Sequence, residues 1–245
     1  MTSALVVAHP DDEALWFSGS LRVVSRVVVC FGDQFDGGAK NARRAKALAD
    51  LPVPGLVALN ITESGTRQLV DWARAGETDF GIDIAEPEGR ARYEANFAVL
   101  VERLRTQLAG VREVVTHNPW GEYGHPEHVQ VYRAVRALQG ALGFRLWVSN
   151  YAAPLSAGFA GRVEARWVNK RALPTDGAYA RRLQGVYLRY RVWTWPVLHR
   201  WPRGEVLYEV APQGQSFAGE VMWDCAKLRL WRALGRVTLP GVSRG

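Results

Sequence analysis

Two short polar clusters interrupt otherwise apolar stretches of this 245-residue chain. The first cluster holds one imidazole and three carboxylates within five residues: His9, Pro10, Asp11, Asp12 and Glu13. The second cluster holds three imidazoles, a phenol and a carboxylate: His117, Tyr123, His125, Glu127 and His128. Imidazole and carboxylate groups together can hold a divalent metal while leaving positions for water and substrate, as catalysis requires. Capping a helix needs one acidic residue rather than three behind a histidine, so we expect a catalytic metal site.

These clusters must be positioned by the elements around them. Short apolar runs predict strands over 3–8, 26–31, 55–59, 111–116 and 144–149. Apolar residues at helical spacing predict helices over 12–21, 40–51, 66–75, 90–108 and 126–138. Strands that alternate with helices indicate an α/β fold, with a mainly parallel sheet covered by helices on both faces. Because ligands bind outside the carboxyl ends of such strands, the two clusters are expected to meet there.

The pattern weakens after residue 149. Strands over 162–168 and 205–211 and helices over 179–190 and 221–234 fit this part of the sequence only loosely. Without a recognisable linker, we expect a single domain over 1–245, with a core over 1–150 and an irregular C-terminal extension over 151–245.

Composition narrows the class of protein. Hydrophobic residues make up 48% and charged residues 22%, as in globular domains. Only Cys30 and Cys225 are present, which excludes a disulfide framework and a cysteine-based zinc finger. No apolar run reaches the ~20 residues of a membrane span, and the first residues lack a signal-peptide pattern. We therefore expect a soluble, cytoplasmic protein.

Positive charge is concentrated in the C-terminal part. Residues 151–245 hold 15 basic and 6 acidic side chains, a net of +9, whereas residues 1–150 carry −2. A basic field attracts anions, so this charge indicates either a substrate with an anionic part or an arginine-rich solvated surface. Contact with a membrane surface is compatible with this charge, and no nucleic-acid motif is present. Trp193, Trp195 and Trp201 could form an aromatic wall beside such a ligand. The oligomeric state is left open.

The motifs Ala8-His9-Pro10-Asp11-Asp12-Glu13 and Tyr123-Gly124-His125-Pro126-Glu127-His128 resemble those of the PIG-L/LmbE-like family. The resemblance covers residues 3–149. It implies a Rossmann-like fold and metal-dependent removal of the N-acetyl group from an N-acetylglucosamine-type sugar or conjugate. The cofactor implied is Zn²⁺, with Fe²⁺ as another candidate.

The resemblance also implies roles for individual residues. His9, Asp12 and His128 would be the metal ligands. Asp11 would be the general base. His125 would stabilise the oxyanion or protonate the leaving amine, and Tyr123 would assist at the oxyanion. We predict that His125 acts in its protonated form, with the nearby Glu127 raising its pKa.

Substrate binding is assigned to Arg43 or Arg44, although the family usually follows this arginine with a glutamate and this chain has Ala45 and Lys46. Glu127 stands where the family mostly has aspartate, and we expect it to orient His125. We expect Glu13 to accept a hydrogen bond from a ligand histidine.

Two other functions fit parts of the pattern. His9, Asp11 and His128 also match the two-histidine, one-carboxylate triad of non-haem Fe(II) oxygenases, which are usually all-β proteins. A basic, tryptophan-rich module that binds glycans or nucleic acid without catalysis is the second alternative.

Overall fold

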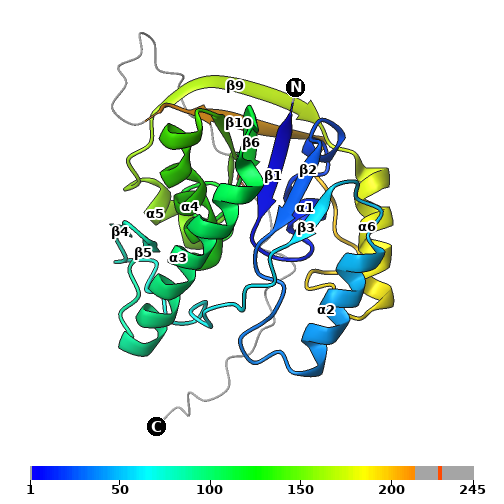
Figure 1. Ribbon diagram of the computed structural model, residues 1–245, viewed down its shortest axis with the longest axis horizontal. Coiled ribbons are helices and arrows are strands. Elements are labelled where there is room, and N and C mark those ends of the chain that lie inside the picture. Colours follow the sequence, from blue (N-terminus) through cyan, green and yellow to red (C-terminus); the bar gives the residue numbers. More distant parts are fainter. Residues whose placement is uncertain (1, 213–225, 228–245) are drawn as a thin grey trace.

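A seven-stranded sheet forms the centre of the protein (Figure 1). The computed structural model describes residues 2–212 and 226–227. Five parallel strands lie in the spatial order β3 (Leu56–Ala58), β2 (Arg26–Val29), β1 (Ser3–Val7), β6 (Glu113–Thr116) and β7 (Arg145–Ser149). Two antiparallel strands, β10 (Gly204–Val210) and β9 (Trp167–Pro174), continue the sheet beyond β7. The predicted α/β fold with a mainly parallel sheet is confirmed.

Helices cover both faces of the sheet, as alternation within β1 requires. Ala4 and Val6 face a core that contains the apolar sides of α3 (Pro87–Leu108), α4 (Pro126–Leu142) and α5 (Pro154–Ala160). Leu5 and Val7 face the core under α1 (Asp12–Trp16), α2 (Ala39–Asp50) and α6 (Gly177–Arg189). Figure 1 shows α3 and α4 on one side of the strands and α2 and α6 on the other. A strand buried on both faces must be apolar throughout, which explains the unbroken run over 3–8.

The long helices begin and end at residues suited to their termini. Pro126 is the first residue of α4, and Gly143 ends the helix in a left-handed conformation with its N–H donating to the Gln139 carbonyl. The Glu86 side chain accepts hydrogen bonds from two backbone N–H groups at the start of α3. The start of α4 is therefore fixed locally, which matters because His125 and His128 lie there.

Two predicted helices are wrong. The helix expected over 12–21 ends at Trp16, followed by a short 3₁₀ turn over Ser20–Arg22, because Gly19 and Ser20 donate their N–H groups to the Glu205 carboxylate. The segment expected as a helix over 66–75 forms separate turns, including one closed by the Ala75 N–H on the Asp71 carbonyl. A short hairpin, β4 (Glu77–Thr78) and β5 (Gly81–Ile82), follows.

The C-terminal part is more regular than expected. Strands β9 and β10 and helix α6 replace the irregular extension, with bounds shifted from those predicted. A two-residue strand, β8 (Tyr151–Ala152), pairs with β11 (Ala226–Lys227). The helix expected over 221–234 lies outside the described residues except for Ala226 and Lys227, which are strand. None of the helices in the described part combines the length and hydropathy of a membrane span.

Candidate metal centre

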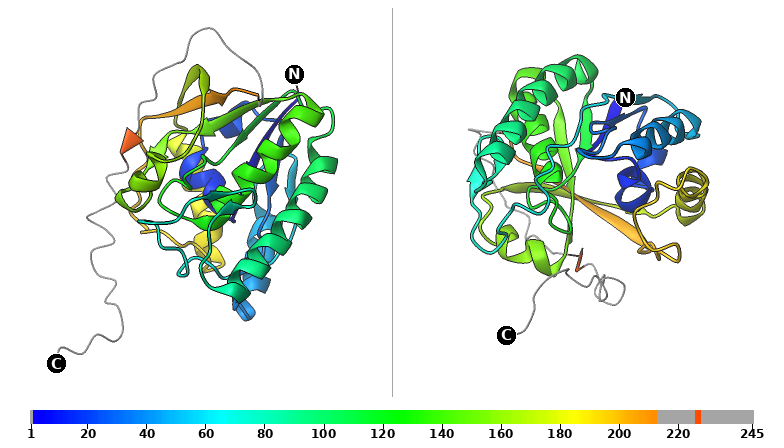
Figure 2. Two further views of the ribbon diagram at one scale, coloured as in Figure 1. Left: turned by 90° about the vertical axis from the view of Figure 1, so that its left-hand side faces the viewer. Right: turned by 90° about the horizontal axis from the view of Figure 1, so that it is seen from below.

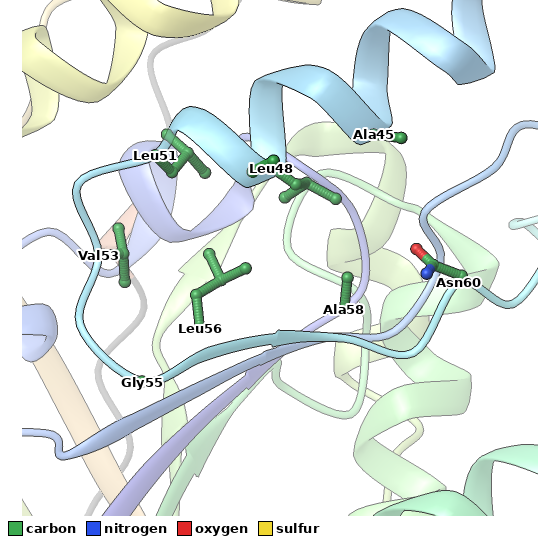
Figure 3. A pocket seen from close by; sticks show the side chains of 9 residues that line it. Ala45, Leu48, Leu51, Val53, Gly55, Leu56, Ala58 and Asn60 are labelled. Carbon is green, nitrogen blue, oxygen red and sulfur yellow. The ribbon is translucent and has the colours of Figure 1, made fainter.

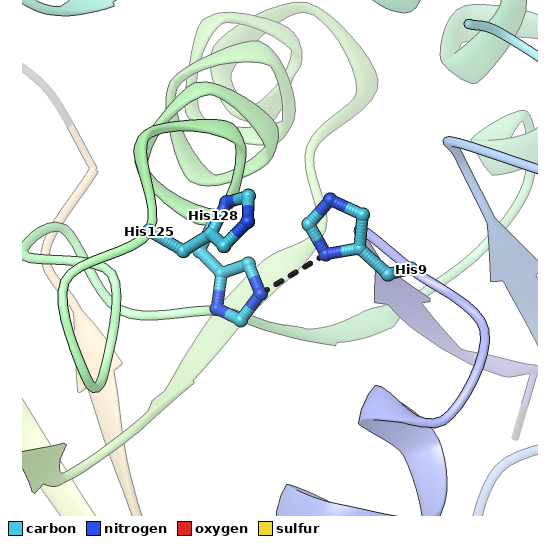
Figure 4. Close-up of side chains that lie close together, drawn as sticks. All are labelled: His9, His125 and His128. Atoms are coloured by element: carbon cyan, nitrogen blue, oxygen red, sulfur yellow. Dashed lines mark hydrogen bonds between the residues drawn. The ribbon is translucent and has the colours of Figure 1, made fainter. Parts of the chain in front are cut away.

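The two polar clusters meet at the carboxyl ends of β1 and β6, which are neighbours in the sheet. His9 follows β1, and His125 and His128 lie at the start of α4 (Figure 4). All three imidazoles are buried or nearly so, as is the Asp12 carboxylate. The expectation that strand ends bring the clusters together is confirmed.

Three donor atoms form an equilateral triangle. The separations His9 Nδ1–Asp12 Oδ2, Asp12 Oδ2–His128 Nε2 and His9 Nδ1–His128 Nε2 are each 3.3 Å. Ligands about 2.0–2.1 Å from a tetrahedral metal are separated by about 3.3–3.4 Å, so the triangle matches three corners of such a site. The fourth corner is left to water or substrate.

The hydrogen bonds of His128 show that the triangle suits a cation. Its Nδ1 lies 2.8 Å from Glu122 Oε2, and a carboxylate accepts, so Nδ1 carries the proton. With Nδ1 committed to Glu122, Nε2 is the nitrogen of His128 that can bind a cation, and it lies 3.3 Å from Asp12 Oδ2. Glu122 also fixes the orientation of the imidazole, so that Nε2 faces this position.

Glu122 was missed by the sequence analysis. It has a left-handed backbone, with φ 50°, and is fully buried. Its carboxylate also accepts from the Asn118 N–H at 3.0 Å and from the Ser149 hydroxyl at 2.6 Å. Burial alone would raise its pKa, but His117 and His128 hold that pKa at about 2. The only sequence signal is an acidic residue between the two histidine positions, in a loop rich in glycine.

His117 supports the site without completing it. Its Nε2 lies 3.4 Å from Asp12 Oδ2 but accepts a hydrogen bond from the Ala8 N–H at 2.9 Å, so its lone pair is already used. Its Nδ1 donates to Glu122 Oε2 at 3.0 Å. His117 thus ties the end of β6 to β1 behind the triangle.

The charges around the triangle also favour a cation. Burial opposes ionisation of Asp12, but His128 and His9 hold its pKa well below the usual range. Burial likewise opposes protonation of His9, yet hydrogen bonds to Asp12 and Glu127 and the charge of Glu63 raise its pKa to about 10. Without metal, His9 therefore holds a proton where a divalent ion would otherwise balance the carboxylates.

Asp11 lies beside the triangle in a different environment. Its backbone is left-handed, with φ 98° and ψ −20°, a strained conformation for a residue other than glycine. Burial, followed by the charge of Asp12, raises its pKa to about 7. The Thr194 hydroxyl donates to its Oδ2 at 2.6 Å. A buried carboxylate with a pKa near neutrality suits proton transfer.

His125 and Tyr123 lie next to the triangle. The ring centroids of His125 and His9 are 4.4 Å apart, and those of Tyr123 and His128 are 5.2 Å apart. Burial raises the pKa of Tyr123 well above its usual range, so its hydroxyl stays a donor.

The protonation state of His125 differs from the sequence prediction that it acts as an imidazolium. Burial, and then the charges of His9 and His128, lower its pKa well below the usual range, so the ring is neutral. Glu127 does not overcome this effect: its Oε2 lies 3.3 Å from His125 Nδ1 and 3.4 Å from His9 Nε2, while its Oε1 accepts from Ser64.

The expected contact of Glu13 is wrong. Its carboxylate accepts from the Tyr187 hydroxyl at 2.8 Å and from the Asp11 N–H at 3.2 Å, rather than from a ligand histidine. Glu13 therefore fixes the backbone of the Asp11 loop to α6. Glu122 makes the contact that Glu13 was expected to make.

Of the two candidate arginines, Arg44 reaches the site. It is buried, and its guanidinium donates to Glu63 at 2.7 Å and to the Phe31 carbonyl at 3.4 Å. Arg43 is exposed. Helical spacing carries the signal that separates them, because Arg44 shares the buried face of α2 with Ala47 and Leu48.

Part of the predicted aromatic wall is present. Trp195 packs edge-on against Tyr123 and Trp16, with ring centroids 5.3 and 5.2 Å apart. Trp193 packs on Tyr187 of α6. The wall therefore begins at the metal centre and continues over α6.

A surface hollow of about 400 Å³ lies elsewhere, between α2 and the edge strand β3 (Figure 3). No candidate site residue lines it. Its lining is mostly aliphatic: Ala45, Leu48, Ala49, Leu51, Val53, Gly55, Leu56, Ala58 and Asn60. The metal centre, rather than this hollow, carries the groups that can do chemistry.

Comparison with known proteins supports the same assignment. The sequence profile described as "PIG-L: GlcNAc-PI de-N-acetylase" matches residues 4–139. The N-acetylglucosaminyl-phosphatidylinositol de-N-acetylase of Bos taurus is 28% identical over 142 residues, which is 55% of this chain and 49% of the relative. The 1D-myo-inositol 2-acetamido-2-deoxy-alpha-D-glucopyranoside deacetylase of Mycolicibacterium smegmatis is 31% identical over 193 residues, or 68% and 66% of the two chains.

A solved structure supports the fold. The zinc-inhibited form of a teicoplanin deacetylase aligns with a TM-score of 0.58 at 16% identity, covering 88% of this chain and all of that one. This chain spans about half the length of the Bos taurus relative and 66% of the mycobacterial one. Because the family profile covers more than half of the chain, including His9, Asp12 and His128, the chain belongs to the PIG-L family.

Proposed function

We propose that this chain is a metal-dependent deacetylase that hydrolyses the N-acetyl amide of an N-acetylglucosamine-type sugar conjugate. The observation that carries the proposal is the triangle of His9, Asp12 and His128 donor atoms beside the separate carboxylate of Asp11. The activities of the relatives, which act on N-acetylated glucosamine conjugates, support this substrate class. The sheet of the described residues is unlike the all-β proteins that usually carry the oxygenase triad.

His9, Asp12 and His128 would hold the metal, for which we propose zinc, with Fe²⁺ as the alternative. When bound, such a cation polarises the amide carbonyl and makes water a stronger nucleophile at neutral pH. Asp11 then accepts a proton from the attacking water, since its pKa of about 7 matches that task.

Neutral His125 donates an N–H hydrogen bond to the oxyanion as negative charge develops there, and the Tyr123 hydroxyl assists. The proton held by Asp11 passes to the departing nitrogen, so that the products are acetate and a free amine. Arg44, paired with Glu63, would bind hydroxyl groups of the sugar.

The test pairs metal analysis with detection of free amine. The panel contains N-acetylglucosamine, N-acetylglucosaminyl-inositol, N-acetylglucosaminyl-phosphatidylinositol and teicoplanin. We expect about one divalent ion per chain, amine and acetate in equal amounts from at least one conjugate, and loss of both on chelation. A metal-loaded chain that releases no amine from any of the four would contradict the proposal.

We further propose that the preferred conjugate carries an anionic group, and we retain a cytoplasmic location as a prediction from sequence. Arg191 and Arg200 are exposed in the segment that also brings Thr194 and Trp195 to the site. Exposed charges are screened over ~8 Å at physiological salt. The KM for N-acetylglucosaminyl-inositol phosphate should therefore rise with ionic strength, while the KM for the uncharged inositol conjugate stays nearly constant. Parallel salt curves would refute the anionic preference.

A further inference from the structure

A segment outside the family match reaches the catalytic centre. Residues 191–203, which we call the strap, join α6 to β10, whereas the family profile ends at residue 139. Trp201 Nε1 of the strap donates to the Ala14 carbonyl of α1 at 2.7 Å, and the Gln184 side chain of α6 donates to the Val197 carbonyl at 2.9 Å. Figure 2 shows α6 beside α1, viewed from below. The strap is thus attached to both helices.

Thr194 of the strap makes two hydrogen bonds to one oxygen of Asp11. Its hydroxyl donates to Asp11 Oδ2 at 2.6 Å, and its backbone N–H donates to the same atom at 3.3 Å. Within the described residues, no hydrogen bond reaches Asp11 Oδ1. One oxygen of the carboxylate is therefore anchored while the other is left to accept a proton.

The rest of the Asp11 loop holds its backbone but not its carboxylate. The Asp11 N–H donates to Glu13, and Glu13 in turn accepts from Tyr187 of α6. These contacts stabilise the left-handed backbone of Asp11. They do not restrict rotation of its side chain about the Cα–Cβ bond. In the part of the chain that the structure describes, only Thr194, 183 residues away in the sequence, fixes the carboxylate itself.

We propose that Thr194 is a positioning residue for the proposed deacetylation, on which this inference rests: its hydroxyl holds Asp11 Oδ2 so that Oδ1 faces the attacking water. The strap then has two roles: its tryptophans line the site, and its Thr194 orients Asp11, the proposed general base. A general base must lie within hydrogen-bond reach of the proton it takes, and misplacement by about 1 Å can cost ~10²-fold in rate.

The test compares Thr194→Val, which keeps the shape of the side chain, with Thr194→Ser, which keeps the hydroxyl. N-acetylglucosaminyl-inositol serves as the substrate for kcat and KM, and bound metal is measured for each variant. We expect Thr194→Val to lower kcat about tenfold or more, with KM within about twofold of wild type and metal content unchanged. Thr194→Ser should recover most of the loss.

Two controls separate positioning from simple attachment of the strap. Gln184→Met removes the hydrogen bond from α6 to the strap without touching Asp11, and its kcat should stay near wild type. In a double-mutant cycle, Thr194→Val should have little further effect once Asp11 is replaced by Asn, because it acts through that carboxylate.

Each result decides a separate point. An unchanged kcat in Thr194→Val, an equal loss in the Asp11→Asn background, or no recovery with Thr194→Ser would overturn the role of Thr194. A wild-type chain that releases no amine from this substrate or from the other conjugates would instead overturn the proposed function. A crystal structure of Thr194→Val checks the inference without activity, because the Asp11 carboxylate should lose its fixed orientation.

Discussion

Replacing Glu122 with Gln should weaken metal binding although Glu122 is not a ligand. One oxygen of Glu122 accepts from both His128 and His117, and the other accepts from the Asn118 N–H and the Ser149 hydroxyl. An amide can present only one oxygen. In either orientation of the amide, its NH₂ group faces either the imidazole N–H groups or the Asn118 N–H. Two hydrogen-bond donors then face each other without an acceptor between them.

The magnitude follows from these contacts. Loss of a carboxylate that orients a metal-binding histidine typically costs 10–100-fold in metal affinity, or about 1.4–2.7 kcal/mol. An unpaired buried donor costs a further ~1–3 kcal/mol of folding free energy. Because the Glu122 pKa is about 2, compared with 4.5 when unperturbed, its contribution is full above about pH 4.5 and is lost as the pH falls toward 2.

The assay is a chelator competition at pH 8, combined with denaturant unfolding of the metal-free protein. Glu205→Gln is the matched control, because Glu205 is equally buried, accepts four hydrogen bonds from residues 18–20 and touches no ligand. Burial raises the Glu205 pKa to about 7, so both carboxylates are ionised at pH 8. Both variants should lose stability, but only Glu122→Gln should lose metal affinity. Equal metal affinity in the two variants would refute the reasoning.

Three further predictions concern the ligands and the catalytic groups. Since the pKa of His9 is about 10 in the metal-free chain, metal binding at pH 7.5 should release about one proton. Calorimetry in buffers of different ionisation enthalpy measures this release. If no proton is released, His9 is not protonated in the metal-free chain. Asp11→Asn should keep its metal and lose ~10²–10⁴ in kcat. The kcat of the wild type should rise with pH through about 7 or slightly below, because the ionised carboxylate is the active form. Near-normal turnover in Asp11→Asn would mean that another group is the base. His125→Ala should bind metal and lose ~10²–10³ in kcat. Because the wild-type ring is neutral, His125 should contribute no alkaline limb to the pH profile of kcat. An alkaline limb that disappears in His125→Ala would show instead that His125 acts in its protonated form.

The sequence was sufficient for the part of the site that strand ends position. In parallel sheets, the residue after a buried strand lies at the carboxyl edge whatever the loops do, so His9 and the start of α4 could be placed together. The split of α1 from the 3₁₀ turn could not be predicted, because it depends on Glu205, which lies 186 residues from Gly19. Local periodicity also led to the wrong prediction of a helix over 66–75. Trp72 and Ala75 are buried at helical spacing there, but the segment forms turns rather than a helix.

Contacts between distant segments decided the rest of the site. The position of Glu122 depends on a left-handed loop conformation, which the residue type at this position does not predict. Thr194 and Tyr187 come from a part of the chain whose pattern was weak, and both reach the Asp11 loop from the segment between β9 and β10. These three residues contact His128, Asp11 and Glu13 in space, and no short sequence motif marks them for that role.

Asp11 and Asp12 show why adjacent, identical side chains can have different roles. Both are buried, which by itself raises the pKa of a carboxyl group. Asp12 lies 3.3 Å from the imidazoles of His9 and His128, and these hold it ionised, as a metal ligand must be. Asp11 lies beside the like charge of Asp12, and this charge adds to burial in raising its pKa to about 7, while its Oδ2 accepts from the Thr194 hydroxyl. Because their surroundings push the two pKa values in opposite directions, we propose that Asp12 binds the metal and that Asp11 accepts the proton.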